Sequence, residues 1–364
     1  MKIKIFFFIP SLEFGGAGNA SINLLKNLDQ QLFDVSLFYQ GKNKYRNEIP
    51  KYINIYKLHK KKTFLNFFKI RKIIKKQIRN NNKNIFISNI HFSNVLSIIF
   101  LRNLKNLKII LFERTSIKEL DLFKKTFNIK NIFIRFLVKR LYFFADLVLT
   151  NSKYAQKELL KFNVQSKIIY SGLLNKIRKK KKFKRKFFFK IISVGRLVAQ
   201  KDYSTMINAI KYIEKKNFKL FIYGEGKLRK LIQNYIDNNH LSKKIILMGH
   251  IKNKNFIYEN SDLLLISSLF EGIPNCVVEA INYSVPIIAS KNFGGNKEVL
   301  DNGKFGDLFE LQNYKQLANK IEKFMEKPSI LQKKVLLGSG SIDKFLIMNT
   351  AEKFEKILLT LCKS

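Results

Sequence analysis

The stretch EGIPNCVVEA, residues 271–280, places two carboxylates, Glu271 and Glu279, eight positions apart around a Gly-x-Pro turn. Glycine permits a sharp exit from a strand and proline suits the first turn of a helix, so we expect a strand end followed by a helix. Carboxylates accept paired hydrogen bonds from vicinal hydroxyls, as sugars and riboses offer. The first N–H groups of the helix, those of Asn275 and Cys276, suit a phosphate. The alternative is that acidic residues simply favour the start of a helix because of its dipole.

A second segment, SVGRLVAQKD, places Gly195, Arg196 and Lys201 after another apolar run. Arginine can bind phosphate oxygens through two parallel hydrogen bonds, whereas lysine acts as a point charge. Two such cations at one strand end could hold a diphosphate. The alternative is that both are ordinary solvated cations of a basic protein.

Glycines also follow other apolar runs. Gly15 and Gly16 lie in SLEFGGAGNA, Gly224 lies in YGEG, and Gly249 precedes His250 in LMGH. Glycine lets the backbone approach a phosphate closely, although such turns also occur for packing alone. The first loop is not GxGxxG, so the dinucleotide-binding fingerprint is absent.

Short apolar runs alternate with amphipathic segments along the whole chain. We expect strands at residues 3–10, 34–40, 84–90, 107–113, 145–152 and 167–172, and then at 187–195, 218–226, 244–250, 262–268, 285–290 and 306–311. These runs are nearly continuously apolar, which is typical of parallel strands covered on both faces. The pattern predicts an α/β protein with doubly wound sheets.

A strongly basic segment, NKIRKKKKFKRK, interrupts this alternation at residues 175–186. We therefore expect an N-terminal Rossmann-like domain at 1–172, a linker at 173–187 and a second Rossmann-like domain at 188–342. A terminal helix at about 343–364 is expected to pack back on the first domain.

The net charge is +43, and it is concentrated in the first half. Residues 1–190 hold 43 basic and 9 acidic side chains, whereas the remaining residues hold 26 and 17. A field this positive attracts nucleic acid, anionic lipid or nucleotide diphosphates. Compositional bias could supply much of the total charge but does not predict its uneven placement. No nucleic-acid-binding module is recognisable, so we expect no nucleic-acid partner.

The two cysteines, Cys276 and Cys362, cannot form a disulfide framework, and no Cys/His cluster indicates a metal. The apolar run at the start ends at Pro10, so we interpret it as a buried strand rather than a signal peptide. No stretch reaches the ~18 apolar residues of a membrane span.

Taken together, PSLEFGGA, DLVLTNS, SVGRL with QKD, YGEG, LMGH and EGIPNCVVEA resemble the retaining glycosyltransferases of family 4, also called glycosyl transferases group 1. The resemblance extends over nearly the whole chain. It implies the GT-B fold, in which two Rossmann-like domains face a central cleft.

The resemblance implies a role for each acidic and basic residue singled out in the two motifs above. Glu279 would hold the ribose hydroxyls of the nucleotide and Glu271 the hydroxyls of the donor sugar. Arg196 and Lys201 would neutralise the diphosphate leaving group.

The resemblance also implies roles for residues near the donor. Gly16 would let the first domain close over the diphosphate, the backbone near Gly249 and His250 would meet the base, and His91 would lie near the sugar. His91 alone, after a strand, is more often a structural histidine. Relatives usually have glycine where this chain has Asp202, a departure that leaves the Lys201 cation in place.

The implied activity is the retaining transfer of a hexose or N-acetylhexosamine from a UDP-sugar to a lipid-linked oligosaccharide, lipopolysaccharide or surface-glycan acceptor. No DxD sequence occurs, so we expect metal-independent transfer without a cofactor. The alternatives are a UDP-sugar epimerase or phosphorylase on the same fold and, on charge alone, a nucleic-acid-binding protein.

Two segments mix aromatic and basic residues as interfacial helices do, residues 67–83 and 131–144. They predict a cytoplasmic protein bound peripherally to the inner face of an anionic membrane. The alternative is a pair of ordinary packed helices with lysine-rich exposed faces.

Overall fold

The computed structural model describes residues 2–12, 16–59, 62–78, 83–115, 117, 120, 129–179, 183, 187–215 and 217–363. The chain forms two compact units. Unit 1 comprises Met1–Asn175 and Lys344–Ser364, and unit 2 comprises Lys176–Asp343. Gly15, one of the glycines expected at a phosphate, lies outside the described residues.

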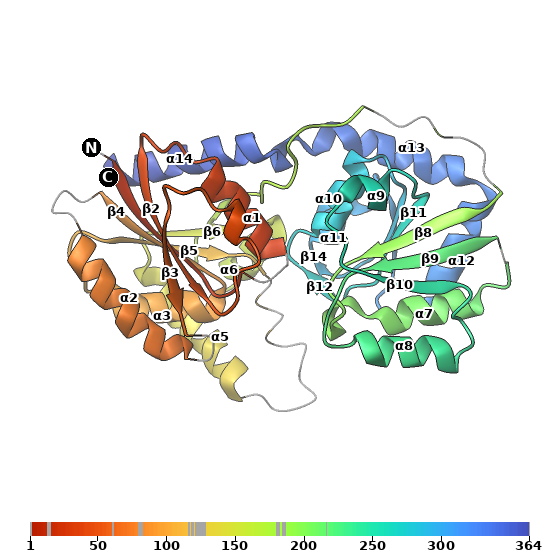
Figure 1. Ribbon diagram of the computed structural model, residues 1–364, viewed down its shortest axis with the longest axis horizontal. Helices are drawn as coiled ribbons and strands as arrows, with labels where there is room; N and C mark the ends of the chain where they lie inside the picture. Colours follow the sequence, from red (N-terminus) through yellow and green to blue (C-terminus); the bar gives the residue numbers. More distant parts are fainter. Residues whose placement is uncertain are drawn as a thin grey trace. The chain divides into compact units, whose positions relative to one another are not determined.

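Unit 1 is built on a parallel sheet of seven strands (Figure 1). Their order across the sheet is β3 (Asn54–Leu58), β2 (Phe33–Gln40), β1 (Ile3–Ile9), β4 (Asn84–Asn89), β5 (Lys108–Glu113), β6 (Leu147–Thr150) and β7 (Lys167–Ile168). Every residue of β1 is buried, as the apolar run predicts. The edge strand β3 is missing from the sequence-based prediction because four of its five residues are not buried and give no apolar run.

Helices cover both faces of this sheet, and successive strand residues point to opposite faces. Phe6, Phe8, Phe38 and Phe86 pack with α2 (Thr63–Gln77), α3 (His91–Leu101), α5 (Ile129–Leu141) and α6 (Lys153–Leu160). Ile5, Phe7, Ile85 and Ile87 pack with α1 (Gly16–Lys26) and α14 (Ile347–Lys363). The doubly wound sheet predicted from the sequence is therefore present.

The C-terminal helix α14 belongs to unit 1. Phe354 and Leu358 are fully buried in the same core as β1. At the ends of the helix, Thr350 donates a hydrogen bond to the Tyr170 carbonyl (3.2 Å), and the Lys108 ammonium donates to the Leu361 carbonyl (2.8 Å). These contacts join the end of the chain to its first 175 residues.

Unit 2 repeats the arrangement with six parallel strands. Their order is β10 (Ile245–Gly249), β9 (Phe218–Tyr223), β8 (Phe189–Val194), β11 (Leu263–Ile266), β13 (Ile287–Ser290) and β15 (Asp307–Phe309), and a separate small sheet pairs β12 (Phe270–Glu271) with β14 (Phe293–Gly294). One face packs on α7 (Tyr203–Tyr212), α8 (Arg229–Asn238) and α12 (Tyr314–Glu326). The other α-helices among the described residues of unit 2 are α9 (Lys254–Tyr258), α10 (Asn275–Asn282), α11 (Gly295–Val299) and α13 (Pro328–Gly338).

Both sheets reverse their strand order beside their first strand, between β1 and β4 in unit 1 and between β8 and β11 in unit 2. In open parallel sheets, ligands bind at the carboxyl ends of the strands flanking such a switch point. Within the described residues, no helix is both long and apolar enough to span a bilayer.

We expect Phe354→Ala to destabilise unit 1 by about 3–5 kcal/mol, because it empties a fully buried phenyl site. Hydrogen exchange of the β1 amides should accelerate, while that of the β8 amides should not. The matched control is Met348→Ala on the same helix, where the side chain is exposed and little change is expected. Equal exchange of β1 in the two variants would contradict the placement of α14.

Candidate functional site

The centre of the site in unit 2 is an ion pair between Lys201 and Glu271. Lys201 ends the short 3₁₀ helix η3 (Ala199–Lys201), which follows β8, and Glu271 ends β12. The two side chains are only 14% and 11% exposed, and the ammonium is hydrogen-bonded to Oε1 of the carboxylate. The structure thus joins two residues that the sequence separates by 70 positions.

Burial and attraction act in opposite directions on this pair. Burial, the largest single cause, lowers the pKa of the Lys201 ammonium. The charge and the hydrogen bond of Glu271, together with the Cys276 sulfur, raise it by more, so the pKa lies above its ordinary value. Burial raises the pKa of the neighbouring Cys276 thiol to about 12. Lys201 is therefore a fixed cation, and Cys276 is a neutral thiol unsuited to act as a nucleophile.

Two glycines make room for the pair. A Cβ at Gly195 would lie 3.0 Å from Cε of Lys201, so the lysine side chain crosses directly over this residue. Gly294 has φ +138° and pairs with Glu271 in the small sheet. A Cβ at Gly294 would lie 1.7 Å from the Glu271 carbonyl oxygen, which excludes any side chain there.

Backbone contacts hold the loop that carries Lys201. The Ser267 hydroxyl lies 2.8 Å from the carbonyl oxygens of both Lys201 and Asp202. The Gln200 amide donates a hydrogen bond to the Phe270 carbonyl (2.8 Å), which ties the loop to β12. Asp202 adopts φ +45° and accepts a hydrogen bond from the Thr205 hydroxyl (2.6 Å) at the start of α7. This sequence therefore uses an aspartate cap where relatives are expected to have glycine.

Glu279 lies in α10 and is also held by two partners. Lys254 forms an ion pair with its Oε1 (2.7 Å), and the Tyr258 hydroxyl donates a hydrogen bond to its Oε2 (2.8 Å). Burial and then the nearby carboxylate raise the pKa of Tyr258 well above its ordinary value, so the phenol remains a donor. Each carboxylate oxygen can accept more than one hydrogen bond, so Glu279 can still accept a pair from vicinal hydroxyls.

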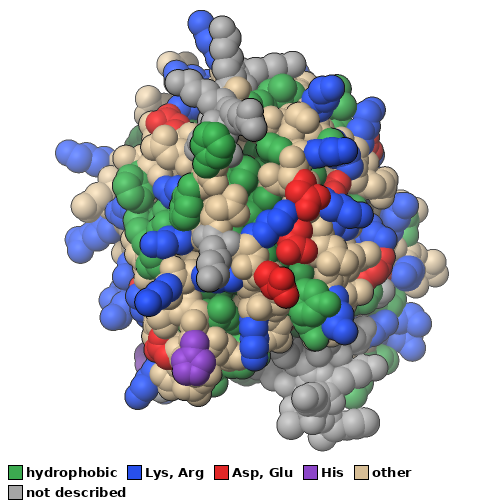
Figure 2. Space-filling model, turned by 90° about the vertical axis from the view of Figure 1, so that its right-hand side faces the viewer, with side chains coloured by type: hydrophobic (Ala, Val, Ile, Leu, Met, Phe, Trp, Pro, Cys, Tyr) green, Lys and Arg blue, Asp and Glu red, His purple; other side chains and the backbone are tan. Residues whose placement is uncertain are grey.

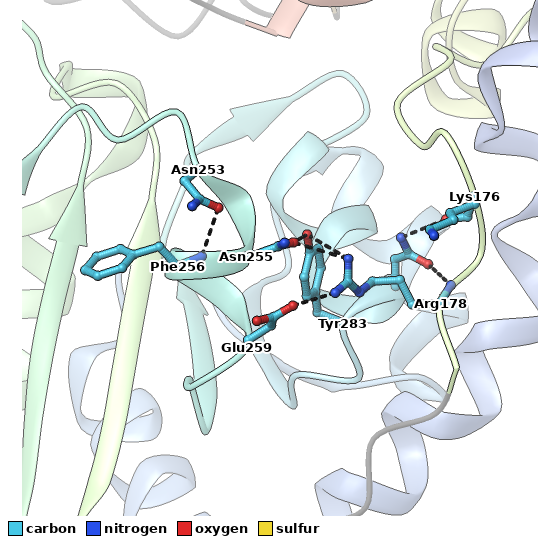
Figure 3. Close-up of polar contacts among 8 residues, drawn as sticks. Lys176, Arg178, Asn253, Asn255, Phe256, Glu259 and Tyr283 are labelled. Carbon is cyan, nitrogen blue, oxygen red and sulfur yellow. Dashed lines mark hydrogen bonds and ion pairs between the residues drawn. The ribbon is translucent and has the colours of Figure 1, made fainter.

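Arg178 contacts the helix α9 and the residue that follows it (Figure 3). This helix supplies both partners of Glu279. The Arg178 guanidinium forms an ion pair with Glu259, donates to Asn255 (3.2 Å) and lies 4.2 Å from the Tyr283 ring centroid. The Arg178 backbone N–H donates to the Asn282 amide oxygen (3.0 Å) at the end of α10. A residue of the basic segment thus fixes α9 and α10 together.

The helix α10 begins at Asn275, whose N–H group the sequence-based interpretation places at the start of the helix, but Pro274 lies just before the first turn instead of within it. Pro274 is its N-cap, with φ −76° and ψ 104°, and Asn275 is its first residue. Proline therefore ends the turn rather than opening the helix. Its carbonyl accepts from the Val277 N–H (3.0 Å), and the N–H groups of Asn275 and Cys276 precede this first helical bond.

The glycine-containing strand ends of unit 2 are joined by backbone hydrogen bonds. Gly195 N–H donates to Tyr223 O (3.0 Å), and Gly224 N–H donates to Gly249 O (2.8 Å). Arg196 and His250 follow the ends of β8 and β10, and both side chains are exposed. The structure therefore gathers the predicted residues of the second domain at one edge of one sheet.

The two remaining predicted residues belong to unit 1. Gly16 is the first residue of α1, after β1, and His91 is the first residue of α3, after β4. His91 is buried, and its Nδ1 lies 3.6 Å from Oε1 of Glu113, which is completely buried at the end of β5. Glu113 Oε2 accepts a hydrogen bond from Tyr142 (2.8 Å). Both predicted positions thus lie at the switch point of unit 1.

Sequence reasoning missed the residues that support the predicted ones, namely Arg178, Lys254, Tyr258, Ser267 and Glu113. None lies in a motif from which the site was predicted, although Arg178 belongs to the basic segment at residues 175–186. Lys254 and Tyr258 are four positions apart on one helix, which is the only local signal that they act together.

Comparison with known proteins identifies the family. The family model described as Glycosyltransferase Family 4 matches residues 14–173, and the one described as Glycosyl transferases group 1 matches residues 175–335. Together they match most of the chain, so the chain belongs to this family and is a glycosyltransferase.

Two curated relatives come from Campylobacter jejuni. One is the GalNAc-alpha-(1->4)-GalNAc-alpha-(1->3)-diNAcBac-PP-undecaprenol alpha-1,4-N-acetyl-D-galactosaminyltransferase, 25% identical over 98% of both chains. The other is the N-acetylgalactosamine-N,N'-diacetylbacillosaminyl-diphospho-undecaprenol 4-alpha-N-acetylgalactosaminyltransferase. It is 28% identical over 62% of this chain and 64% of its own length.

A solved structure shows the same fold. The chain is similar to HepE of Anabaena in complex with UDP-glucose, with a TM-score of 0.81, 17% identity and coverage of 98% of this chain and 99% of that one. The predicted GT-B fold is thereby confirmed.

We expect Gly294→Ala to destabilise unit 2 by more than about 2 kcal/mol, because the new Cβ would overlap the Glu271 carbonyl in a strained backbone region. Thermal unfolding followed by circular dichroism measures the effect. The matched control is Gly340→Ala, where a Cβ would meet nothing within 4 Å. Equal melting temperatures for the two variants would contradict the described position of Glu271.

Proposed function

We propose that the protein is a retaining glycosyltransferase that moves a hexose or N-acetylhexosamine from a UDP-sugar to a lipid-linked oligosaccharide or surface-glycan acceptor. The observation that carries the proposal is the buried Lys201–Glu271 pair at the switch point of unit 2, with Glu279 on the following helix. This edge offers a fixed cation and two carboxylates, which match a diphosphate and two hydroxyl-bearing sugars.

The Lys201–Glu271 pair supports an exchange of partners on binding. When the donor diphosphate arrives, the Lys201 ammonium turns from the carboxylate to the phosphate oxygens. Glu271 is then released to accept hydrogen bonds from the donor sugar. The pair keeps both buried charges compensated in the absence of the donor, since an unpaired buried charge is costly.

The negative charge that develops in the transition state accounts for the cationic residues of the site. Cleavage of the glycosidic bond places negative charge on the leaving diphosphate, which Lys201 and Arg196 stabilise electrostatically. The N–H groups of Asn275 and Cys276 add uncharged donors. Because side chains of the protein supply this stabilisation, we expect transfer to proceed without a metal ion and to survive treatment with EDTA.

The relatives support the choice of substrates. HepE was solved with UDP-glucose, and both Campylobacter relatives are named for the transfer of N-acetylgalactosamine to undecaprenol-linked glycans. A UDP-linked hexose or N-acetylhexosamine and a prenyl-diphosphate-linked acceptor are therefore the substrates that we assign to this protein.

We expect Glu279→Gln to lower kcat/KM for the UDP-sugar roughly 10- to 100-fold, the value of a hydrogen bond to a charged group. Lys201→Met should lower kcat about 100- to 1,000-fold, as the loss of a charge-stabilising group does. The assay measures UDP release from a panel of UDP-hexoses and UDP-N-acetylhexosamines supplied with bacterial membrane extract.

The matched control is Glu214→Gln, the same change at an exposed position of unit 2, and it should retain wild-type activity. Full activity of Glu279→Gln would overturn the site. Consumption of UDP-sugar without any acceptor would overturn transfer in favour of epimerisation or hydrolysis.

We further propose that the enzyme binds the cytoplasmic face of an anionic membrane through one surface of unit 1. This α2–α3–α5 surface comprises exposed apolar residues on three helices and on the 3₁₀ turn η2 (Tyr142–Phe144). Its apolar members, each about half exposed, are Phe64, Leu65, Phe68, Ile99, Ile132, Phe133, Phe136, Phe143 and Phe144. Figure 1 shows α2, α3 and α5 on the same side of the sheet.

Charge complementarity supports a lipid partner for this surface. Lys69, Arg71, Lys72, Lys75 and Lys76 lie on α2, and Arg135, Lys139 and Arg140 lie on α5. Neither helix contains an acidic residue. On the face of the molecule drawn in Figure 2, by contrast, Lys and Arg side chains are interspersed with Asp and Glu. Exposed aromatic rings beside cations, on helices that contain no acidic residue, are typical of interfacial helices.

We expect the triple variant Arg135→Gln/Lys139→Gln/Arg140→Gln to bind vesicles containing anionic phosphatidylglycerol roughly 100-fold more weakly, at about 1 kcal/mol per removed charge. Co-sedimentation measures binding, which should be lost at high salt and on neutral phosphatidylcholine. The control, Lys219→Gln/Lys227→Gln/Lys230→Gln, removes three exposed charges from unit 2. Equal losses in the two triple variants would contradict a dedicated surface.

A further inference from the structure

We propose that unit 1 contains a second, separate binding site, centred on Arg114, for the diphosphate group of the acceptor. The site lies at the carboxyl ends of β4, β5 and β6. The choice of a diphosphate as its ligand rests on the proposed function, whereas the site as an oxyanion-binding site rests on the geometry of unit 1 alone.

Arg114 follows β5 directly and is only 5% exposed. Its Nε donates a hydrogen bond to Oδ1 of Asn89 (2.7 Å), and its guanidinium lies 4.1 Å from the centroid of the Phe112 ring. These two contacts fix the plane of the guanidinium. Nη2 is buried and has no hydrogen-bond partner among the described residues.

The charge of Arg114 is not compensated within the described part of unit 1. Glu113, the adjacent carboxylate, directs its oxygens to Tyr142 and toward His91 instead. Burial lowers the pKa of the Arg114 guanidinium to about 9, which is the direction expected for a buried cation without an anionic partner. Buried charges in proteins are normally paired, so the missing anion is expected to come from a ligand.

Residues beside Arg114 carry further buried polar atoms without a partner. The Asn151 side chain donates a hydrogen bond to the Arg114 carbonyl (3.1 Å), while its Oδ1 is buried without a partner among the described residues. The hydroxyl of Thr115, the next residue in sequence, is likewise buried without a partner among them. Buried polar atoms are mostly satisfied in folded proteins, so these two atoms and Nη2 of Arg114 together indicate a ligand.

The chemistry of the Arg114 guanidinium favours an oxyanion as the ligand. A guanidinium presents a planar fork that binds phosphate oxygens through two parallel hydrogen bonds. The hydroxyl of the adjacent Thr115, buried without a partner among the described residues, can donate to an oxyanion as well. The site also lies beside the switch point of unit 1, where Asn89 donates to the Phe8 carbonyl (2.8 Å) and so links β4 to β1.

The test is the binding of geranyl diphosphate to the full chain by isothermal titration calorimetry, with no donor and no membrane. We expect Arg114→Gln to weaken binding roughly 10- to 100-fold, the effect of losing a charge-assisted hydrogen bond. The control is Arg46→Gln, which removes an exposed arginine from the same unit and should bind as the wild type does. Geraniol, which lacks the diphosphate, should bind all variants equally.

Two further arms separate the alternatives. UDP should bind the wild type and Arg114→Gln equally, whereas weaker UDP binding by the variant would assign Arg114 to the donor diphosphate and overturn the proposal. If Arg114→Gln fails to fold, Arg114→Lys replaces it in the test. This variant retains the charge but loses the planar guanidinium, and it should bind the diphosphate about 3- to 10-fold more weakly than the wild type does. Unchanged binding by a folded Arg114 variant would overturn the proposal.

These outcomes are independent of catalysis. Arg114-dependent binding of geranyl diphosphate by an enzyme that transfers no sugar would remove the proposed function and retain the oxyanion site. Sugar transfer with Arg114-independent binding would retain the function and remove the site.

Discussion

The buried ion pair between Lys201 and Glu271 is the constraint around which unit 2 is arranged. Two opposite charges can be buried together only when their geometry is fixed and their remaining contacts are satisfied. Gly195 and Gly294 lack the side chains that would obstruct the pair, and Ser267 binds the backbone behind Lys201. The pair also compensates both of its buried charges at this strand end.

The mostly buried carboxylate of Glu279 is also compensated, but by different partners. Its carboxylate has Lys254 on one oxygen and Tyr258 on the other, and both partners come from one short helix. A helix of five residues has little stability of its own, so its position depends on tertiary contacts. Arg178, from the basic segment, supplies two of these contacts, to Asn255 on the helix and to Glu259 at its C-terminal end.

Unit 1 distributes its charges differently. Its interior holds a carboxylate and a guanidinium, Glu113 and Arg114, that are neighbours in sequence but have separate partners. Its outer helices α2 and α5 have cations and no acids. The uneven net charge of the sequence therefore has a structural counterpart, since α2 and α5 of unit 1 place cations beside exposed aromatic rings.

The sequence by itself determined the α/β class, the positions of most strands and the strand ends that carry the site. The reason is that buried parallel strands need nearly continuous apolar runs and their exits need glycine and polar residues. It did not reveal β3, whose exposed residues give no such run, or the position of Pro274 as the N-cap of α10. Only the tertiary structure brought Lys201 to Glu271, Arg178 to α9 and Asn89 to Arg114, because each contact joins segments 25 or more residues apart. Pairing at such distances depends on how the strands are ordered in the sheet, and local sequence does not encode that order.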